Sequence, residues 1–159
     1  MKKRKPNRLP DYDYSSCGAY FITVCTRNKE KLFWSDVGAA IGRPESGEYR
    51  LSEYGLIVES AINNIEKIYS TISVDKYTVM PNHIHIILLI NSDESGRPMA
   101  APTISTVINQ MKGFVSKQIG FSVWQKSFYD HIIRGQNDYD EIWRYIDENP
   151  LNWTLDELY

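Results

Sequence analysis

The segment that most constrains this chain is HIHIILLI, residues 83–90, an apolar run that opens with two histidines separated by one isoleucine. Its β-branched and aliphatic residues predict a strand, and because no polar residue follows His85 within it, we expect the strand to be deeply buried. Residues i and i+2 of a strand share a face, so His83 and His85 can reach one divalent metal ion together. Two imidazoles begin a metal site but do not complete it.

The same histidines also admit a structural interpretation. A histidine on a strand is often hydrogen-bonded to its neighbours or exposed, and a His-x-His pair taken alone is only a moderate indication of a metal. Here the pair stands at the start of the strand, at the edge of the expected core, where solvent could deliver a metal ion. The position therefore favours a metal site.

Hydrophobic periodicity predicts seven elements in the order β-α-β-β-α-β-α. That order is typical of an α+β fold, a ferredoxin-like split β-α-β sandwich with an antiparallel sheet and one extra C-terminal helix. A short Pro81-Asn82 turn before the third strand favours an antiparallel hairpin there. We expect strands over residues 19–26, 71–80, 83–90 and 127–134, helices over 52–69, 103–119 and 138–148, a Gly-rich loop over 38–47 and a turn over 135–137.

Each predicted helix carries apolar residues near helical spacing. In the last helix these residues form the stripe expected to face the core, and Pro150 is expected to end that helix. The apolar positions are Leu56, Ile57, Ala61, Ile65 and Ile68 in the first helix, Ile104, Val107, Ile108, Met111 and Val115 in the second, and Tyr139, Ile142, Trp143 and Ile146 in the last.

The length of 159 residues, 42% of them hydrophobic, is enough for one domain, residues 1–159, with its own core. No apolar run reaches the roughly 18 to 20 residues that a membrane span needs, and the basic start lacks the apolar segment of a secretory signal. We therefore expect a cytoplasmic protein with no membrane partner. Cys17 and Cys25 give no disulfide framework in that compartment, and small buried residues are the simplest interpretation.

The formal net charge of −2 argues mildly against a nucleic-acid-binding protein, but the charge is unevenly distributed. A basic arm over residues 1–10 includes Arg4, Lys5 and Arg8, whereas acidic residues gather in the second half of the chain. An arm of this kind can bind phosphates, and it can equally be a solvated tail. The charge therefore leaves a nucleic-acid partner open.

A tyrosine and an asparagine on the last helix are candidates for the remaining chemistry. At about 100° per residue, Tyr145 and Asn149 lie on the same side of the apolar stripe and flank it. Residues at i and i+4 share a helix face, so the phenol and the amide oxygen can address one point. A phenol, with a pKa of about 10, attacks a phosphate only when a metal ion or a base assists loss of its proton. Periodicity alone leaves simple packing of both residues as the alternative.

Three sequence blocks, taken together and in order, resemble one known family. They are RLPDYDYSSCGAYFITVCTRNKEKLF at residues 8–33, YTVMPNHIHIILLI at 77–90 and VWQKSFYDHIIRGQNDYDEIWRYIDENPLNW at 123–153. The specific part is MPNHIH with a downstream YIxxNP. The chain resembles the single-tyrosine HUH transposases, and most closely the REP-associated tyrosine transposases, over nearly its whole length. The resemblance implies a fold of the HUH endonuclease type.

The resemblance also implies a role for each matching residue. His83 and His85 match the pair that binds Mg²⁺ or Mn²⁺. Tyr145 matches the nucleophile, and Asn149 matches the position that completes the metal set. The implied reaction is attack of the tyrosine on a phosphodiester of single-stranded DNA, which leaves a 5′-phosphotyrosyl link and a free 3′-OH. The implied substrates are hairpin-forming DNA repeats, and both a monomer and a homodimer remain open.

Three further residues are weaker candidates for DNA contact. Lys112 and Arg134 could bind phosphates, although salt bridges explain exposed cations equally well. His131 could orient a ligand or touch the DNA, or it could pack against its neighbours.

Two alternatives to transposition stay open. A nicking enzyme that acts in replication or repair of repeats would use the same site. A catalytically silent module that binds single-stranded nucleic acid would share only the fold, because a fold alone does not fix function.

Overall fold

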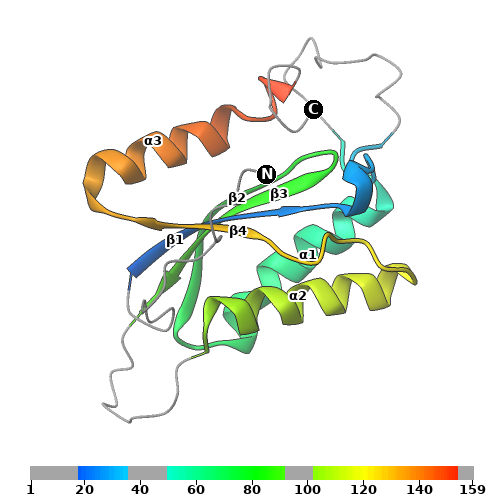
Figure 1. The fold of residues 1–159 in the computed structure, drawn as a ribbon, viewed down its shortest axis with the longest axis horizontal. Helices are drawn as coiled ribbons and strands as arrows, with labels where there is room; N and C mark the ends of the chain where they lie inside the picture. The colour runs from blue at the N-terminus through cyan, green and yellow to red at the C-terminus, as the bar shows by residue number, and fades with distance from the viewer. Residues whose placement is uncertain (1–17, 36–49, 92–101, 154–159) are drawn as a thin grey trace, which may run out of the picture.

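The computed structural model describes residues 18–35, 50–91 and 102–153 (Figure 1). The predicted basic arm with Arg4, Lys5 and Arg8, the loop over 38–47 and Cys17 lie outside the described residues. None of the described helices combines the length and the apolar character that crossing a membrane requires. The elements are β1 (Gly18–Cys25), the short 3-10 helix η1 (Arg27–Lys29), α1 (Glu53–Ile68), β2 (Ile72–Val79), β3 (His83–Ile90), α2 (Ile104–Ile119), β4 (Tyr129–Ile133) and α3 (Gly135–Glu148).

The described strands form one antiparallel sheet in the order β2-β3-β1-β4, which confirms the predicted ferredoxin-like fold. The crossover through α1 joins β1 to β2, and the crossover through α2 joins β3 to β4, so each passes over the strand between them. The middle of the sheet is therefore β3 and β1. At the start of β3, His83 pairs with Cys25 and His85 pairs with Thr23.

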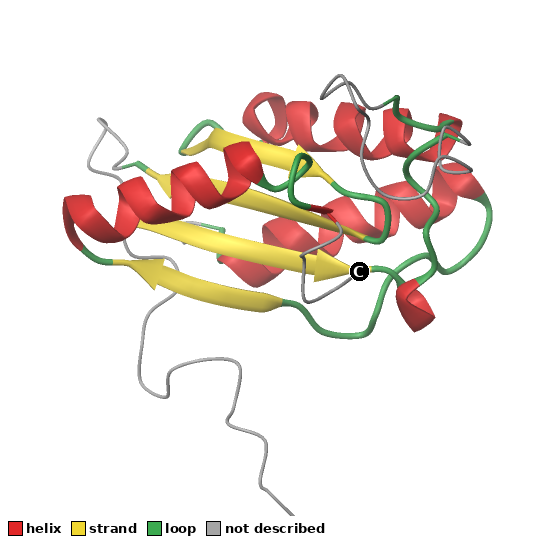
Figure 2. Cartoon of the chain, turned by 90° about the horizontal axis from the view of Figure 1, so that it is seen from above, coloured by secondary structure: helices red, strands yellow, loops and turns green. Residues whose placement is uncertain are grey.

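The sheet is covered by different helices on its two faces. Helices α1 and α2 pack on one face, and α3 lies across the other (Figure 1). Figure 2 views the sheet from the α3 side and shows that this helix leaves the face of β4 uncovered. The α3 face is therefore only partly shielded from solvent.

The side chains of β3 alternate between these two layers. Ile84 and Ile86 belong to the core beneath α1 and α2, and Ile87 packs beneath α3. Because alternate residues of a strand share a face, His83 and His85 point to the α3 side with Ile87. All five side chains are buried, which confirms the expected deep burial of this strand.

Helix α1 faces the sheet with a set of residues that differs from the predicted stripe. Ala61 and Ile65 are buried as expected, but Leu56 and Ile68 are 56% and 66% exposed. The buried face is centred on Ile62, which is fully buried. Leu56 and Ile68 each stand six positions from Ile62, which places them about 120° around the helix.

The stripe predicted for α2 is buried throughout, whereas that of α3 is buried only in part. All five apolar positions predicted for α2 are core residues. In α3, Ile146 is buried, Tyr139 and Ile142 are half-buried, and Trp143 is 39% exposed. Among the described helices only α3 lies on this face of the sheet, so none of them buries its flanks.

Helix α3 begins at Gly135, so the prediction of a turn over residues 135–137 was wrong. Gly135 has a φ of +79°, in the left-handed region that glycine tolerates, and reverses the chain directly after β4. The Asp138 carboxylate then accepts a hydrogen bond from the backbone N–H of Arg134 at 2.9 Å. One glycine and one carboxylate thus replace the expected three-residue turn.

Polar contacts from β2 hold α3 against the sheet. A bulge in β2 turns Asp75 and Lys76 toward the helix. The Tyr139 hydroxyl donates to Asp75, and this hydrogen bond, with some burial, raises the pKa of Tyr139 to about 12. The Lys76 ammonium lies 2.8 Å from the Asp147 carboxylate and 4.0 Å from the centre of the Trp143 ring. These contacts fix the rotation of α3 over the sheet.

One isoleucine and one leucine of α1, Ile62 and Leu56, test the orientation of this helix on the sheet. Replacement Ile62→Ala should lower the free energy of unfolding by about 2 to 5 kcal/mol, because it opens a cavity in the core. Replacement Leu56→Ala should lower it by less than about 1 kcal/mol, because that side chain is already largely in water. Urea denaturation followed by circular dichroism measures both values. Equal losses would contradict the observed orientation of α1.

Candidate active site

The two histidines lie together at the start of β3. Their ring centres are 4.6 Å apart, and both side chains are almost completely buried, at 0% and 2% exposure. Burial of two imidazoles costs free energy unless their nitrogen atoms find partners. The surroundings of each ring therefore define what the pair can do.

Each histidine uses its Nδ1 atom for a hydrogen bond within the protein. Nδ1 of His83 lies 2.7 Å from Oδ1 of Asn82, and Nδ1 of His85 lies 2.8 Å from Oγ1 of Thr23. An amide oxygen only accepts, so Nδ1 of His83 donates this hydrogen bond, and Nε2 is the ring nitrogen that could bind a metal. Metal-binding histidines are oriented by such a bond from the second ring nitrogen.

Helix α3 places Tyr145 over this pair. The Tyr145 ring lies 5.3 Å from the ring of His85 and 6.3 Å from that of Phe21, measured between centres. Phe21 in turn stacks on His85 at 5.2 Å, so it forms the floor beneath both residues. The Tyr145 side chain is 46% exposed. A phenol can therefore meet a substrate from solvent while its ring stays beside an imidazole.

Asn149 continues the same side of α3 and is buried. It follows the last helical residue and keeps helical backbone angles, φ −58° and ψ −44°, although Pro150 disfavours that conformation for the residue before it. Trp153, four positions later, lies 5.9 Å from the ring of His83. Asn149 is buried between two residues of known position in the sequence: Tyr145, whose ring lies beside His85, and Trp153, whose ring lies beside His83.

The donor set fits a hard or borderline divalent cation. Nε2 of His83, Nε2 of His85 and Oδ1 of Asn149 are all buried atoms. Within the described residues, no group of three His, Cys, Asp or Glu side chains could hold a metal ion. These three residues could supply two imidazole nitrogens and one neutral oxygen to Mg²⁺ or Mn²⁺, and water or phosphate oxygens would then complete the coordination.

Lys112 lies away from the histidines. It is buried on α2, in the layer on the opposite face of the sheet, and its ammonium donates to the carbonyl oxygens of Gln125 and Lys126 at 2.8 and 3.3 Å. Burial lowers its pKa. The structure thus gives Lys112 a packing role and does not bring it into the candidate site.

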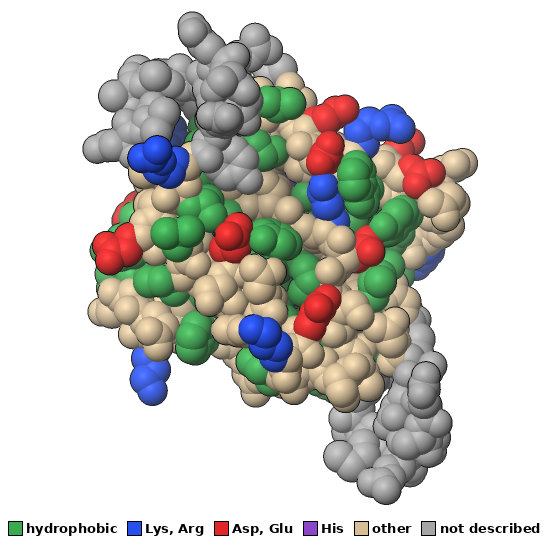
Figure 3. All heavy atoms as spheres, turned by 180° about the vertical axis from the view of Figure 1, so that it is seen from behind, with side chains coloured by type: hydrophobic (Ala, Val, Ile, Leu, Met, Phe, Trp, Pro, Cys, Tyr) green, Lys and Arg blue, Asp and Glu red, His purple; other side chains and the backbone are tan. Residues whose placement is uncertain are grey.

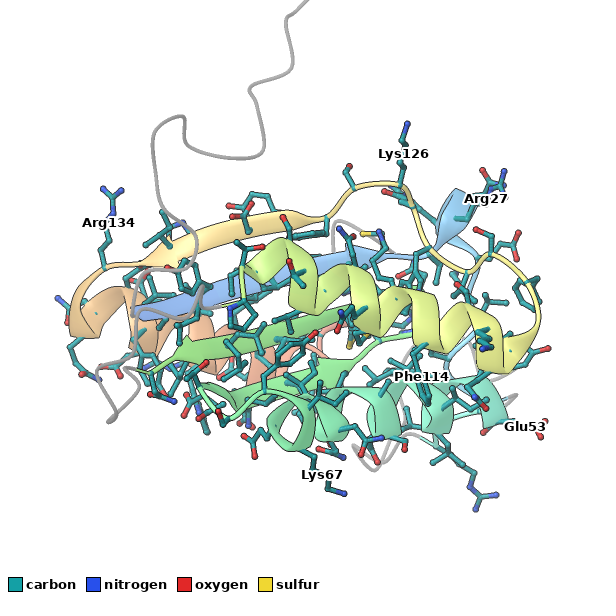
Figure 4. All side chains as sticks on the ribbon, turned by 90° about the horizontal axis from the view of Figure 1, so that it is seen from below. Arg27, Glu53, Lys67, Phe114, Lys126 and Arg134 are labelled. Atoms are coloured by element: carbon teal, nitrogen blue, oxygen red, sulfur yellow. The ribbon has the colours of Figure 1, made fainter. Side chains whose placement is uncertain are left out.

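His131 and Arg134 meet the beginning of α3. Nε2 of His131 lies 2.9 Å from the Asp138 carboxylate, which also accepts from the Arg134 backbone N–H. The Arg134 side chain is exposed and points away from the fold (Figure 4). It lies five positions along β4 from Tyr129, which pairs with Thr23 beside His85. That is roughly 16 Å along the strand, so Arg134 is remote from the histidines.

Four residues of the site were missed in the sequence: Asn82, Thr23, Phe21 and Trp153. Asn82 is the neighbour of His83, and its amide could have been proposed as the orienting group. The others come from segments about 60 or more residues away, and only the pairing of β1 with β3 and the path of α3 bring them to the histidines.

Comparisons with known proteins place the chain in a family. No protein-family model matches it. An uncharacterised protein from Haemophilus influenzae is 32% identical over 175 aligned positions, which cover 98% of this chain and 93% of that protein. The chain belongs to the family of this protein. The identity extends over both chains almost completely, so the two share one fold.

Solved structures show which fold this is. A REP-associated tyrosine transposase bound to a REP hairpin matches 94% of this chain and 76% of that chain, with a TM-score of 0.65 and 20% identity. This match confirms the HUH transposase fold. A match to a candidate transposase from Deinococcus radiodurans covers 93% of this chain and 97% of the transposase chain, at 15% identity. Its TM-score of 0.48 is too low for a comparison of sites.

The carboxylate at the start of α3 makes a pH dependence testable. The hydrogen bonds from the Arg134 backbone and from His131 lower the pKa of Asp138 below its ordinary value of 3.8. The folded state therefore gains stability from the ionised carboxylate above that value and loses it as the pH falls through the lowered pKa. Wild type should exceed Asp138→Asn in stability above about pH 4 and converge with it at lower pH, in urea unfolding from about pH 6 to 2.5. A constant difference across this range would contradict the assignment.

Proposed function

We propose that this chain is a metal-dependent endonuclease and strand transferase for single-stranded DNA, with Tyr145 as its nucleophile. One observation carries the proposal: α3 places the half-exposed phenol of Tyr145 beside His85, one of two adjacent buried histidines. A tyrosine packed only for stability would have no need of a buried histidine pair next to its ring.

The residues around Tyr145 have two separate roles in this proposal, metal binding and positioning of the tyrosine ring. His83, His85 and Asn149 would hold Mg²⁺ or Mn²⁺, and when bound the cation would polarise a phosphodiester and hold it in line. Phe21 and His85 keep the Tyr145 ring in place, so its hydroxyl can attack the phosphorus. A bond forms between the tyrosine oxygen and phosphorus, and the bond from phosphorus to the 3′-oxygen breaks. The products are a 5′-phosphotyrosyl link and a free 3′-OH.

The covalent link makes the reaction reversible. The phosphotyrosyl bond conserves the energy of the phosphodiester, so a 3′-OH can later attack the same phosphorus and release Tyr145 without ATP. Hydrolysis would discard that energy. Helix α3 does not extend over β4 (Figure 2), and Tyr129 of that strand is 50% exposed, so DNA could reach this side of the sheet.

The arrangement supports action of the tyrosine on the metal site of its own chain. β4 ends at Ile133 and α3 begins at Gly135, so a single residue joins them. The Asp75 and Lys76 contacts then hold α3 on its own sheet. We propose a monomer as the active unit, and cis attack by Tyr145.

Hairpin-forming repeats are the proposed substrates. The support comes from the shared fold with a REP-associated tyrosine transposase that binds a REP hairpin. Single strands beside a hairpin expose bases and phosphates that a partly open sheet face can accept.

The nucleophile can be tested by covalent capture. Wild type, Tyr145→Phe and the matched control Tyr129→Phe are incubated with Mn²⁺ and labelled single-stranded hairpin oligonucleotides, and denaturing gels are run. Tyr129 is also a half-exposed tyrosine on the α3 face, so its loss removes a similar hydroxyl nearby. We expect a protein-linked band with wild type and Tyr129→Phe, and at least a roughly 10³-fold loss with Tyr145→Phe.

Two other results would redirect the interpretation. Tight binding with no covalent product from any variant would instead favour a catalytically silent nucleic-acid-binding module on this fold. A band that survives Tyr145→Phe would reject Tyr145 as the nucleophile.

The metal site can be tested without DNA. Titration of the purified protein with Mn²⁺ by calorimetry should show one site that is lost in His83→Ala and His85→Ala. Thr23→Val removes the group that orients His85 and should weaken binding by about 10- to 100-fold. His131→Ala is the matched control, because this histidine binds Asp138 instead, and it should bind Mn²⁺ like wild type. Equal binding by all four variants would contradict a metal site at the pair.

A further inference from the structure

The turn that follows β1, residues 27–31, has an unusual backbone and an unusual charge. It reads RNKEK, with three cations and one carboxylate, and all five side chains are exposed. Asn28 and Lys29 both lie in the left-handed region, with φ of 56° and 54°. Two successive non-glycine residues there are rare, and such strain in other proteins concentrates at functional sites. We call residues 27–31 the basic turn.

The basic turn is anchored to the residue that orients the first histidine. Thr26, at its base, donates both its backbone N–H and its hydroxyl to the carbonyl oxygen of Asn82, at 2.9 and 3.1 Å. The side chain of Asn82 accepts from His83. The Thr26 hydroxyl also lies 2.7 Å from the carbonyl of Glu30, which closes the turn. The turn therefore has a fixed position relative to the histidine pair.

One aromatic ring connects the turn to the candidate active site. The ammonium of Lys31 lies 5.8 Å from the centre of the Trp153 ring, and that ring lies 5.9 Å from the ring of His83. A phosphate chain that leaves the histidines past Trp153 would therefore meet Lys31.

A further cation from the loop before β4 joins the same end of the sheet. Gln125 donates its backbone N–H to the carbonyl of Cys25, and Arg27 donates its own to the carbonyl of Val123, so the loop and the turn lie side by side. Lys126 follows in that loop, and Figure 4 shows Arg27 and Lys126 at this end of the molecule, both directed into solvent. Neither forms an ion pair with another residue in the described ranges.

The charges on α3 affect the path that a single DNA strand could follow away from the histidines. Residues 135–148 contain five carboxylates and a single arginine, so the outer side of this helix repels phosphates. On the face of the molecule seen from behind, acidic and basic side chains are interspersed with apolar ones (Figure 3). Asp138 and Asp147 are paired with His131 and Lys76, and the other three carboxylates leave α3 acidic. A strand bound at the histidines would therefore meet a more favourable potential at the basic turn than along α3.

We propose that the basic turn and Lys126 form a phosphate-binding track for the single-stranded DNA next to the bond that is cut. Arg27, Lys29, Lys31 and Lys126 each contact backbone phosphates. The strained turn holds the first three side chains, and the neighbouring loop before β4 holds Lys126. The contacts carry no base specificity, because they address the backbone alone. This inference rests on the proposed function, since it needs a strand that starts at the histidine pair.

The test measures DNA binding and not cleavage. In a Tyr145→Phe background with EDTA, no covalent product can form, so fluorescence anisotropy with a labelled single-stranded oligonucleotide reports binding alone. The triple variant Arg27→Gln, Lys29→Gln and Lys31→Gln should bind at least roughly tenfold more weakly at about 50 mM salt. The slope of log Kobs against log salt should fall by about 2, since each lost phosphate contact removes about 0.7 from a single-strand slope.

A matched control changes cations on the opposite face of the sheet. Lys67→Gln with Lys117→Gln removes two exposed lysines from α1 and α2, and the affinity and slope should equal those of the parent. The thermal unfolding midpoint of the triple variant checks that the turn still folds. A variant that carries Arg27→Lys in place of Arg27→Gln, with Lys29→Gln and Lys31→Gln kept, should recover about a third of the lost slope. Unchanged binding by the folded triple variant, or an equal loss in the control, would overturn the track.

The two proposals fail separately. If the wild type forms the covalent product but the triple variant binds DNA normally, the track is wrong and the nuclease stands. If binding depends on the basic turn but no covalent product forms with Mn²⁺, the track stands as part of a binding module and Tyr145 chemistry is wrong.

Discussion

The structure depends on the burial of β3 between two layers that differ in character. On one face, its isoleucines pack into the core beneath α1 and α2. On the other face, α3 packs over His85 and Ile87, and Trp153 after this helix lies beside His83. Buried imidazoles are tolerated only when hydrogen bonds offset the loss of water, and Asn82 and Thr23 supply these bonds. The bonds that make the histidines tolerable also orient their Nε2 atoms.

The position of α3 converts that buried pair into a candidate active site. Tyr139 and Asp147 bind the bulged segment of β2, so the helix is fixed at one edge of the sheet. Its opposite flank then carries Tyr145 over His85, and the following turn brings Trp153 to His83. A helix held by apolar contacts alone could rotate with little cost, whereas the paired charges and the Tyr139 hydrogen bond define one rotation. The contacts between α3 and β2 thus keep the half-exposed Tyr145 ring beside His85.

Sequence periodicity predicted the fold well because each layer imposes its own repeat. The unbroken apolar run after His85 and the spacing in α2 both correspond to buried side chains. The errors arose where local spacing could not decide an orientation. Leu56 and Ile68 have helical spacing but point to solvent, and α3 begins a turn early because Gly135 and Asp138 can start it. Lys112 resembled a surface cation, yet it is held inside by two carbonyl oxygens.

The sequence by itself determined the order of the elements, the shared face of His83 and His85, and the shared side of Tyr145 and Asn149 on their helix, because strand and helix periods act over a few residues. Only the tertiary structure decided that Tyr145 meets His85. It also decided that Thr23 and Phe21 complete the surroundings of His85, and that the cations after β1 lie beside the same end of the sheet. Contacts across 60 or more residues depend on strand register and on the rotation of a docked helix, and neither is encoded by any local spacing.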